Sequence, residues 1–245
     1  MKQSPLAIVF GGSRGIGAAC VQALARDGFD VAFTYVSNAG QARELEARPH
    51  GERRVRGYAA DICDAAAVAR VFADAARDFD RAPSAVVANA GINVLPSPVG
   101  QFKTEDFRKL VEVNVVGAFN ILREASQRVA DGGAIIALTT SLVRHAAPGI
   151  GPYSATKAAV ECLVRSMAKE LSPRKVRVNA VAPGPVDTDL FNAGKTDEAK
   201  QRSAAMSPFN RIGAPAEIAE VVSFLASDKA SWMQGQIVQP NGGLI

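Results

Sequence analysis

The sequence has 245 residues, of which 48% are hydrophobic and 21% are charged, and this balance suits one α/β domain with a large core. Its 28 basic and 24 acidic side chains leave a formal net charge of +4 without a long basic run, so no nucleic-acid partner is expected. The three cysteines, Cys20, Cys63 and Cys162, are interpreted as small core residues in a reduced compartment. With two histidines and no Cys/His cluster, no metal site is expected.

The chain begins with a short polar stretch, residues 1–5, that leads directly into an apolar run. That run is too short for a signal peptide or a membrane span. We therefore expect a cytoplasmic protein without a membrane partner.

A glycine-rich turn follows the first predicted strand. Residues 6–10 are continuously apolar, as is typical of a strand buried on both faces, and residues 18–26 have the amphipathic pattern of a helix. Between them lie Gly11, Gly15 and Gly17. Because glycine has no Cβ, the backbone amides and the positive end of the helix dipole can approach a pyrophosphate. A P-loop is excluded because no Gly-Lys-Ser/Thr follows.

The second predicted strand, residues 31–35, indicates which dinucleotide is bound. Enzymes that prefer NAD usually place an acid just beyond this strand to bind the ribose 2′-hydroxyl. Here the corresponding residues are Ser37 and Asn38, and the first acid, Glu44, already lies in the next predicted helix. Arg14 in the glycine turn can pair with a 2′-phosphate, although a solvated loop charge is the alternative. We therefore predict NADP.

The third and fourth predicted strands cover residues 53–58 and 84–88. Asp61 follows the third strand and can accept a hydrogen bond from an adenine amino group, or it can cap the helix that begins near Asp64. The fourth strand ends in three small residues, which allow the chain to pass close to a cofactor; these are Asn89, Ala90 and Gly91.

A long helix is predicted over residues 104–129, and it carries Asn114 among valines. An asparagine that faces a sheet needs a hydrogen-bond partner. Two roles are open for it, either a bond to a neighbouring carbonyl or support of a water behind the catalytic pair described next.

The fifth predicted strand, residues 133–138, leads to three hydroxyls, Thr139, Thr140 and Ser141. After the loop 142–152, Tyr153 and Lys157 stand four residues apart, on one face of a predicted helix. A fixed cation stabilises a phenolate, so we expect Lys157 to lower the pKa of Tyr153 towards neutrality. The alternative is a packed ring and a solvated charge.

The rest of the chain completes an alternating pattern. A sixth strand is predicted over residues 176–181, a helix over 216–227 and a short strand over 236–239, whereas residues 187–211 resemble a flap with short helices. Alternating strands and helices predict a doubly wound parallel sheet of about seven strands flanked by helices. Ligands of such sheets bind at the carboxyl ends of the strands. The singled-out residues Gly11, Asp61, Asn89, Thr140 and Pro183 all fall there.

Four motifs in order, Gly11-x-x-x-Gly15-x-Gly17, Asn89-Ala90-Gly91, Tyr153-x-x-x-Lys157 and Pro183-Gly184, resemble those of the short-chain dehydrogenase/reductase family over nearly the whole chain. The overall sequence is most similar to 3-oxoacyl-carrier-protein reductase-like members. The resemblance implies a single Rossmann domain over residues 1–245, NAD(P)(H)-dependent oxidation or reduction of an alcohol/carbonyl pair, and a homotetramer.

The resemblance also implies roles for individual residues. Tyr153 is the general acid/base, Lys157 lowers its pKa and binds the nicotinamide ribose, and Asn114 supports a proton-relay water. Thr140 is the ungapped match to the family's serine, but Ser141, one residue further, has the usual chemistry and is slightly preferred. The implied cofactor-binding residues are Gly11, Ser13, Arg14, Gly15, Ile16, Gly17, Ser37, Asn38, Asp61, Ile62, Asn89, Ala90, Gly91, Tyr153, Lys157, Pro183, Gly184, Val186 and Thr188.

Two positions depart from the family's pattern. Phe10 stands where a threonine is common, and Ala88 where a first asparagine is frequent. The first change removes a hydrogen bond that ties the glycine turn, so weaker cofactor binding is expected.

Three functions are consistent with these features. The preferred one is an NADPH-dependent reductase that acts on a small-molecule carbonyl of the 3-oxoacyl type. The alternative enzyme is an NADP-dependent polyol or sugar-type alcohol dehydrogenase, and the non-enzymatic alternative is a catalytically silent cofactor-binding regulator.

Overall fold

A single parallel sheet organises the computed structural model, which describes residues 4–245; the prediction for residues 1–3 lies outside that range. The strands are β1 (Leu6–Phe10), β2 (Asp30–Tyr35), β3 (Val55–Ala59), β4 (Ala85–Ala88), β5 (Ala134–Leu138), β6 (Arg177–Val181) and β7 (Ile237–Val238). Their order is β3-β2-β1-β4-β5-β6-β7, with parallel pairing throughout. The predicted doubly wound sheet is confirmed.

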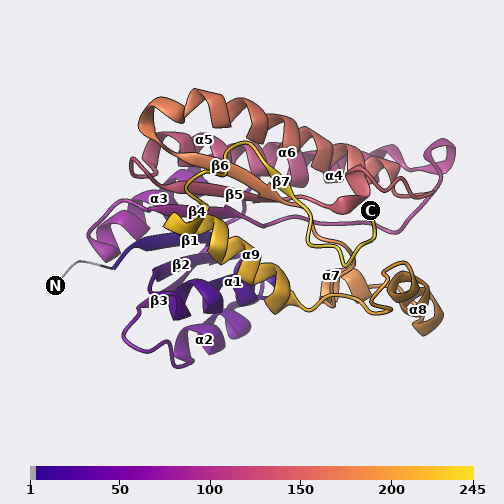
Figure 1. The fold of residues 1–245 in the computed structure, drawn as a ribbon, viewed down its shortest axis with the longest axis horizontal. Helices are drawn as coiled ribbons and strands as arrows, with labels where there is room; N and C mark the ends of the chain where they lie inside the picture. The colour runs from indigo at the N-terminus through magenta and orange to yellow at the C-terminus, as the bar shows by residue number, and fades with distance from the viewer. Residues whose placement is uncertain (1–3) are drawn as a thin grey trace.

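Helices cover both faces of the sheet (Figure 1). Those that pack on one face are α3 (Ala65–Phe79), α5 (Ala118–Arg128) and α6 (Gly151–Glu170). Those on the other face are α1 (Gly15–Arg26), α2 (Ala39–Ala47) and α9 (Pro215–Ala226). The remaining helices are α4 (Thr104–Val111), α7 (Asp189–Asn192) and α8 (Asp197–Ala205), of which the last two lie in the predicted flap. No helix within residues 4–245 is long and apolar enough to cross a membrane.

The central strands β1, β4 and β5 are apolar throughout because helices bury both of their faces, whereas β2, β3 and β6 also carry polar residues. Alternate residues of β1 point to opposite sides: Ile8 joins the core on the α3, α5 and α6 side, and Val9 joins the core on the α1 and α9 side. All five residues of β1 are fully buried. This burial fixes the register, since a shift by one residue would exchange the two faces.

Strand β1 pairs with β2 at one edge and with β4 at the other. The strand order therefore reverses between β1 and β4. In open α/β sheets this point opens a crevice at the carboxyl ends of the strands. Gly11 and Asn89 stand directly after β1 and β4, at the base of that crevice.

The structure corrects two predictions. The single helix over 104–129 is interrupted by a π-helical turn, Glu112–Gly117, which contains Asn114. Gly117, the last residue of that turn, packs against Ile62, since a Cβ there would lie 2.6 Å from Ile62 Cδ1. Such π turns frequently occur at functional sites. Also, Cys162 is exposed on α6 and is not a core residue, whereas Cys20 is buried.

Candidate active site

A cleft of about 380 Å³ opens at the carboxyl ends of the strands around β1 and β4. It is lined by the predicted residues Gly11, Ser13, Arg14, Gly15, Ile16, Gly17, Ser37, Asn38, Asp61, Ile62, Asn89, Ala90, Gly91 and Thr188. The predicted residues Tyr153, Lys157, Pro183, Gly184 and Val186 do not line it. The residues that sequence reasoning missed are Thr34, Tyr35, Val36, Ala60, Ile92, Val113, Asp189 and Leu190. Most of these residues adjoin a predicted residue. Including the one or two neighbours of each predicted residue would therefore have found them.

The glycine turn requires residues without a Cβ at several positions. Gly11 and Gly15 have φ angles of +75° and +53°, in the left-handed region that favours glycine. A Cβ on Gly17 would lie 2.0 Å from the carbonyl oxygen of Gly11, so α1 begins directly against the end of β1. The start of α1 therefore points its free amides into the cleft, as a dinucleotide site requires.

The turn is held by side chains from neighbouring strands. Thr34 on β2 accepts a hydrogen bond from the Gly11 amide, with an N–O distance of 2.9 Å. Asn89 donates to the Gly11 carbonyl at 2.8 Å. Thr34 thus supplies a hydrogen bond to the turn from the adjacent strand, and the weaker cofactor binding expected from Phe10 stays a prediction.

Polar side chains line the part of the cleft that lies beyond the ends of β2 and β3. Ser37 is exposed, Asn38 binds Gln41 Oε1 through its amide at 3.1 Å, and the Arg14 side chain is exposed beside them. Asp61 accepts a hydrogen bond from the Cys63 amide at 2.9 Å. It does not cap the following helix, because Asp64 caps α3.

Tyr153 and Lys157 lie in the first two turns of α6. The ammonium of Lys157 is buried and donates to the carbonyl of Leu138, the last residue of β5, at 3.0 Å. Burial disfavours charge, so it lowers the pKa of Lys157 to about 8. The same effect raises the pKa of Tyr153 to about 12. In the polypeptide alone, burial thus shifts the pKa of Tyr153 in the direction opposite to the lowering that we expected from Lys157.

Asn114 is fully buried behind this pair. Its Oδ1 accepts from the Ile92 amide at 2.8 Å, and its Nδ2 donates to the Ile92 carbonyl at 2.9 Å and to Thr156 Oγ1 at 3.2 Å. One amide hydrogen thus fixes the loop after β4, and the other binds Thr156 on α6. A Cβ on Gly91 would lie 3.1 Å from Asn114 Oδ1 and 3.2 Å from Lys157 Nζ, so these polar groups converge where only glycine fits.

The two candidate hydroxyls differ in their bonding. Ser141 Oγ donates to the Ala182 carbonyl at 2.7 Å and accepts from Asn241 Nδ2 at 3.2 Å. Thr140 Oγ1 accepts a hydrogen bond from the Leu142 amide at 3.3 Å and keeps its own hydrogen available. The geometry therefore favours Thr140 as the hydroxyl that can donate to a substrate, against our slight preference for Ser141.

Known proteins resemble this chain over its full length. A family model described as enoyl-(acyl carrier protein) reductase matches residues 11–245. A short-chain type dehydrogenase/reductase from Picea abies is 38% identical over 250 residues, which cover 98% of this chain and 92% of the relative. An NADPH-dependent aldehyde reductase-like protein from Arabidopsis thaliana is also 38% identical, with 98% and 94% covered. A 3-oxoacyl-[acyl-carrier-protein] reductase from Staphylococcus aureus is 34% identical, with 100% and 99% covered.

Solved structures agree with this resemblance. A short-chain dehydrogenase/reductase from Serratia marcescens matches with a TM-score of 0.91 at 34% identity, covering 99% of this chain and 98% of the other. A short-chain dehydrogenase from Burkholderia cenocepacia in complex with NADP matches with a TM-score of 0.90 at 30% identity, with the same coverage. The fold and the site define an NAD(P)-dependent oxidoreductase. The chain belongs to the short-chain dehydrogenase/reductase family.

Replacing Gly17 by alanine is expected to abolish dinucleotide binding, because the new Cβ would collide with the Gly11 carbonyl 2.0 Å away. Titration of NADPH fluorescence measures the effect. Gly100→Ala is the matched control, since no atom lies within 4 Å of its Cβ position. Unchanged affinity in Gly17→Ala would contradict the placement of the pyrophosphate at this turn.

Proposed function

We propose that this protein is an NADP(H)-dependent reductase of carbonyl groups, with 3-oxoacyl-type compounds as the preferred substrate class. The observation that carries the proposal is the convergence of Lys157, Asn114 and Gly91 at the strand ends, beside the glycine-turn cleft. Tyr153 stands one helical turn before Lys157 on the same face of α6.

The chemistry requires a proton and a hydride. When bound, the reduced cofactor supplies the hydride to the carbonyl carbon. With a pKa of about 12, Tyr153 keeps its proton at neutral pH and can donate it to the substrate oxygen. Lys157, with a pKa of about 8, is largely an ammonium at pH 7, so its charge favours the phenolate that is left. Thr140 donates a hydrogen bond to the same oxygen and orients the carbonyl.

Apolar side chains beside the cleft, the flap and the start of α6 support the proposed substrate class. Leu95, in the loop after β4, is 70% exposed and lies 2.9 Å from the Cβ position of flap residue Gly194. Leu190 on α7 is 47% exposed and lines the cleft. Val99 lies 3.7 Å from the Cβ position of Gly151. Apolar walls favour a 3-oxoacyl chain or an apolar aldehyde over a polyol, which would need polar partners.

The preference for NADP rests on the residues beyond β2. Ser37, Asn38 and Arg14 line the cleft where an acid would favour NAD. The Arabidopsis relative bears the name of an NADPH-dependent reductase, and the Burkholderia structure contains NADP.

Arg14→Ala is expected to weaken NADPH binding about 10- to 100-fold, the value of one charge-assisted bond to a phosphate. NADH, which has no 2′-phosphate, should bind the variant and the parent equally. Parallel titrations with both cofactors measure this. A parent enzyme that prefers NADH would refute the proposed specificity.

Tyr153→Phe should retain NADPH binding and lose about 10²- to 10⁴-fold in turnover, because only the proton donor is removed. Turnover is followed by NADPH oxidation with a panel of 3-oxoacyl thioesters, apolar aldehydes and sugars, and with polyols in the oxidative direction. Full activity of the variant would exclude Tyr153 as the acid. A parent that acts on polyols alone would favour the alcohol dehydrogenase instead.

Thr140→Ala should lower kcat about 10²-fold or more, the typical cost of one oxyanion donor, and Thr140→Ser should retain most activity. Ser141→Ala should cost far less, because its hydroxyl is bonded to Ala182 and Asn241. Steady-state kinetics of the three variants decide the assignment. A larger loss in Ser141→Ala would restore Ser141 as the catalytic hydroxyl.

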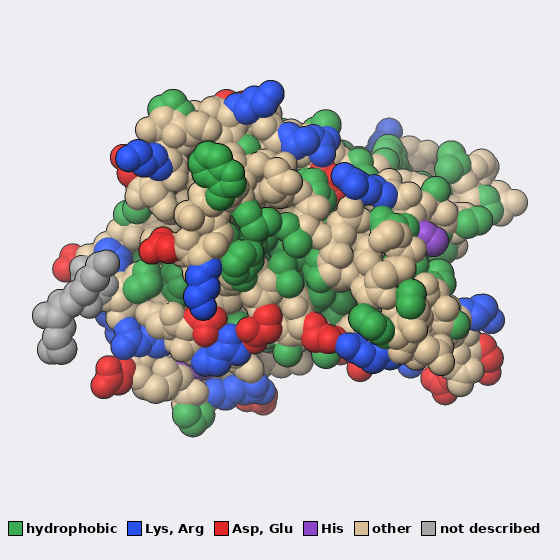
Figure 2. Space-filling view, in the orientation of Figure 1, with side chains coloured by type: hydrophobic (Ala, Val, Ile, Leu, Met, Phe, Trp, Pro, Cys, Tyr) green, Lys and Arg blue, Asp and Glu red, His purple; other side chains and the backbone are tan. Residues whose placement is uncertain are grey.

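We further propose a cytoplasmic homotetramer of single-domain chains, each with a substrate flap over residues 187–211. Hydrophobic side chains gather over the face that carries α9 (Figure 2). There Phe224 and Trp232 are 41% and 98% exposed, and a second set on α4, the π turn and α5 comprises Phe107, Val116 and Phe119. Two separate apolar patches suit two different two-fold interfaces, and hence a tetramer.

Light scattering should therefore give the mass of four 25.6 kDa chains. Trp232→Glu should reduce the assembly to dimers, because it places a charge in one of the two patches. A monomeric parent at micromolar concentration would contradict the proposal.

A further inference from the structure

The segment 239–245, which follows β7, turns back across the carboxyl edge of the sheet. Figure 1 shows this yellow segment running towards α7 and then reversing. It is not a free tail, because Asn241 and Gly242 contact three parts of the site that are far apart in sequence. Those parts are the hydroxyl segment after β5, the loop after β6 and the end of the flap.

The first contact is with the hydroxyl segment. Asn241 Nδ2 donates to Ser141 Oγ at 3.2 Å, and Ser141 Oγ in turn donates to the Ala182 carbonyl at 2.7 Å. The Ser141 amide also donates to the Pro183 carbonyl at 2.9 Å. Ser141 is therefore held by both its side chain and its backbone, and Thr140 is the residue next to it.

The second contact is with the loop after β6. The Gly184 amide donates to the Pro240 carbonyl at 3.2 Å, and a Cβ on Gly184 would lie 2.9 Å from Asn241 Cα. The amides of Gly243 and Leu244 donate to Asn241 Oδ1 at 3.0 and 3.2 Å. Because Oδ1 takes these two donors, the amide nitrogen of Asn241 must face Ser141.

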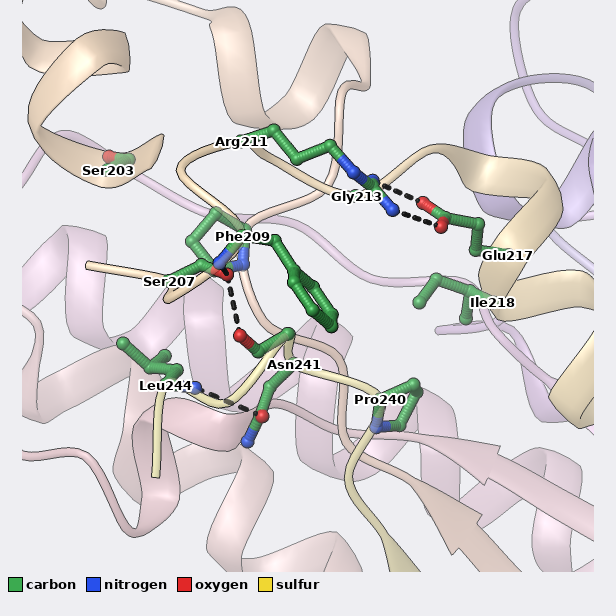
Figure 3. Close-up of a pocket in the computed structure, with 12 residues that line it drawn as sticks. Ser203, Ser207, Phe209, Arg211, Gly213, Glu217, Ile218, Pro240, Asn241 and Leu244 are labelled. Carbon is green, nitrogen blue, oxygen red and sulfur yellow. Dashed lines mark hydrogen bonds and ion pairs between the residues drawn. The ribbon is translucent and has the colours of Figure 1, made fainter. Parts of the chain in front are cut away.

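The third contact is with the flap. Ser207, buried at the end of α8, donates from its hydroxyl to the Gly242 carbonyl at 2.6 Å. Ser207 and Asn241 both line a cavity of about 130 Å³. Figure 3 shows them on neighbouring segments of the chain beside this cavity. On the other side of this cavity, Arg211 and Glu217 form an ion pair with a 2.6 Å N–O distance. The turn around Asn241 thus joins the flap to the hydroxyl segment.

We propose that Asn241 is a positioning residue: it holds Ser141, and through Ser141 the Thr140 hydroxyl, in place for the carbonyl oxygen. The same turn holds the flap through the bond between Gly242 and Ser207. Asn241 does not line the cofactor cleft, so its effect is on the reaction and not on dinucleotide affinity. This role rests on the proposed reductase activity with Thr140 as a substrate ligand.

Two substitutions of Asn241 separate its donor from its acceptor. Asn241→Ala removes both, whereas Asn241→Asp keeps the oxygen that binds the Gly243 and Leu244 amides and loses the donor to Ser141. Both should lower kcat about 3- to 10-fold, the value of one neutral hydrogen bond, with an unchanged Kd for NADPH. Combining Asn241→Ala with Ser141→Ala should cost no more than Ser141→Ala alone.

Asn179→Ala is the matched control. Asn179, which is buried whereas Asn241 is half-buried, ties β6 to the segment before β7 with bonds of 2.9 Å to Met233 and Gln236, but it lies inside the strand and away from the carboxyl edge. It should lower Tm by a few degrees and leave kcat unchanged. If Asn241→Ala also changes Tm alone, Asn241 is merely structural and the proposal is wrong.

Ser207→Ala tests the other end of the turn. With the flap released from Gly242, KM for the carbonyl substrate should rise about 3- to 10-fold while kcat stays unchanged. A fall in kcat at constant KM would contradict the separation of the two roles.

Hydrogen exchange tests the role without turnover. In Asn241→Ala, the amides of Ser141, Arg144 and His145, which bond to Pro183 and to the Ser141 carbonyl, should exchange faster than in the parent and in Asn179→Ala. Unchanged exchange would overturn the positioning role. A parent with no NADPH-dependent turnover would instead overturn the proposed function, and the exchange result would still decide the role of Asn241.

Discussion

The buried bond between the Lys157 ammonium and the last carbonyl of β5 fixes the catalytic helix against the sheet. A charge in this position is costly, which is why burial lowers its pKa to about 8 and why the ammonium needs the Leu138 oxygen. Since Tyr153 lies one turn earlier on the same helix, this bond also sets where the phenol stands. The position of α6 relative to the end of β5 therefore places both residues of the proposed catalytic pair.

The same edge of the sheet is organised by side-chain amides and hydroxyls that bind backbone. Asn89 and Thr34 hold the glycine turn, Asn114 holds the loop after β4, and Asn241 holds the segment after β5. Loops at strand ends have backbone groups without ladder partners, and these polar side chains satisfy them. The loops at this edge are thus tied to one another by hydrogen bonds, whereas the flap over residues 187–211 has one buried residue, Ser207.

Burial gives the phenol and the ammonium opposite pKa shifts, and both shifts favour the neutral forms. In the absence of other charges, Tyr153 is thus a weaker acid than a phenol in water. In the proposed reaction, a positive charge that forms near the phenol would lower the pKa of Tyr153 and so oppose the effect of burial. The oxidised cofactor and the Lys157 ammonium would both supply such a charge.

The sequence by itself determined the alternating architecture, the glycine turn and the pairing of Tyr153 with Lys157, because these are local patterns of period, spacing and missing side chains. Only the tertiary structure showed that Thr34 holds the glycine turn from β2, that a π turn carries Asn114, and that burial raises the pKa of Tyr153. It alone brought Asn241 to Ser141, 100 residues away in the chain. Such effects depend on which segments become neighbours and how deeply they are buried, and neither quantity is written in local sequence.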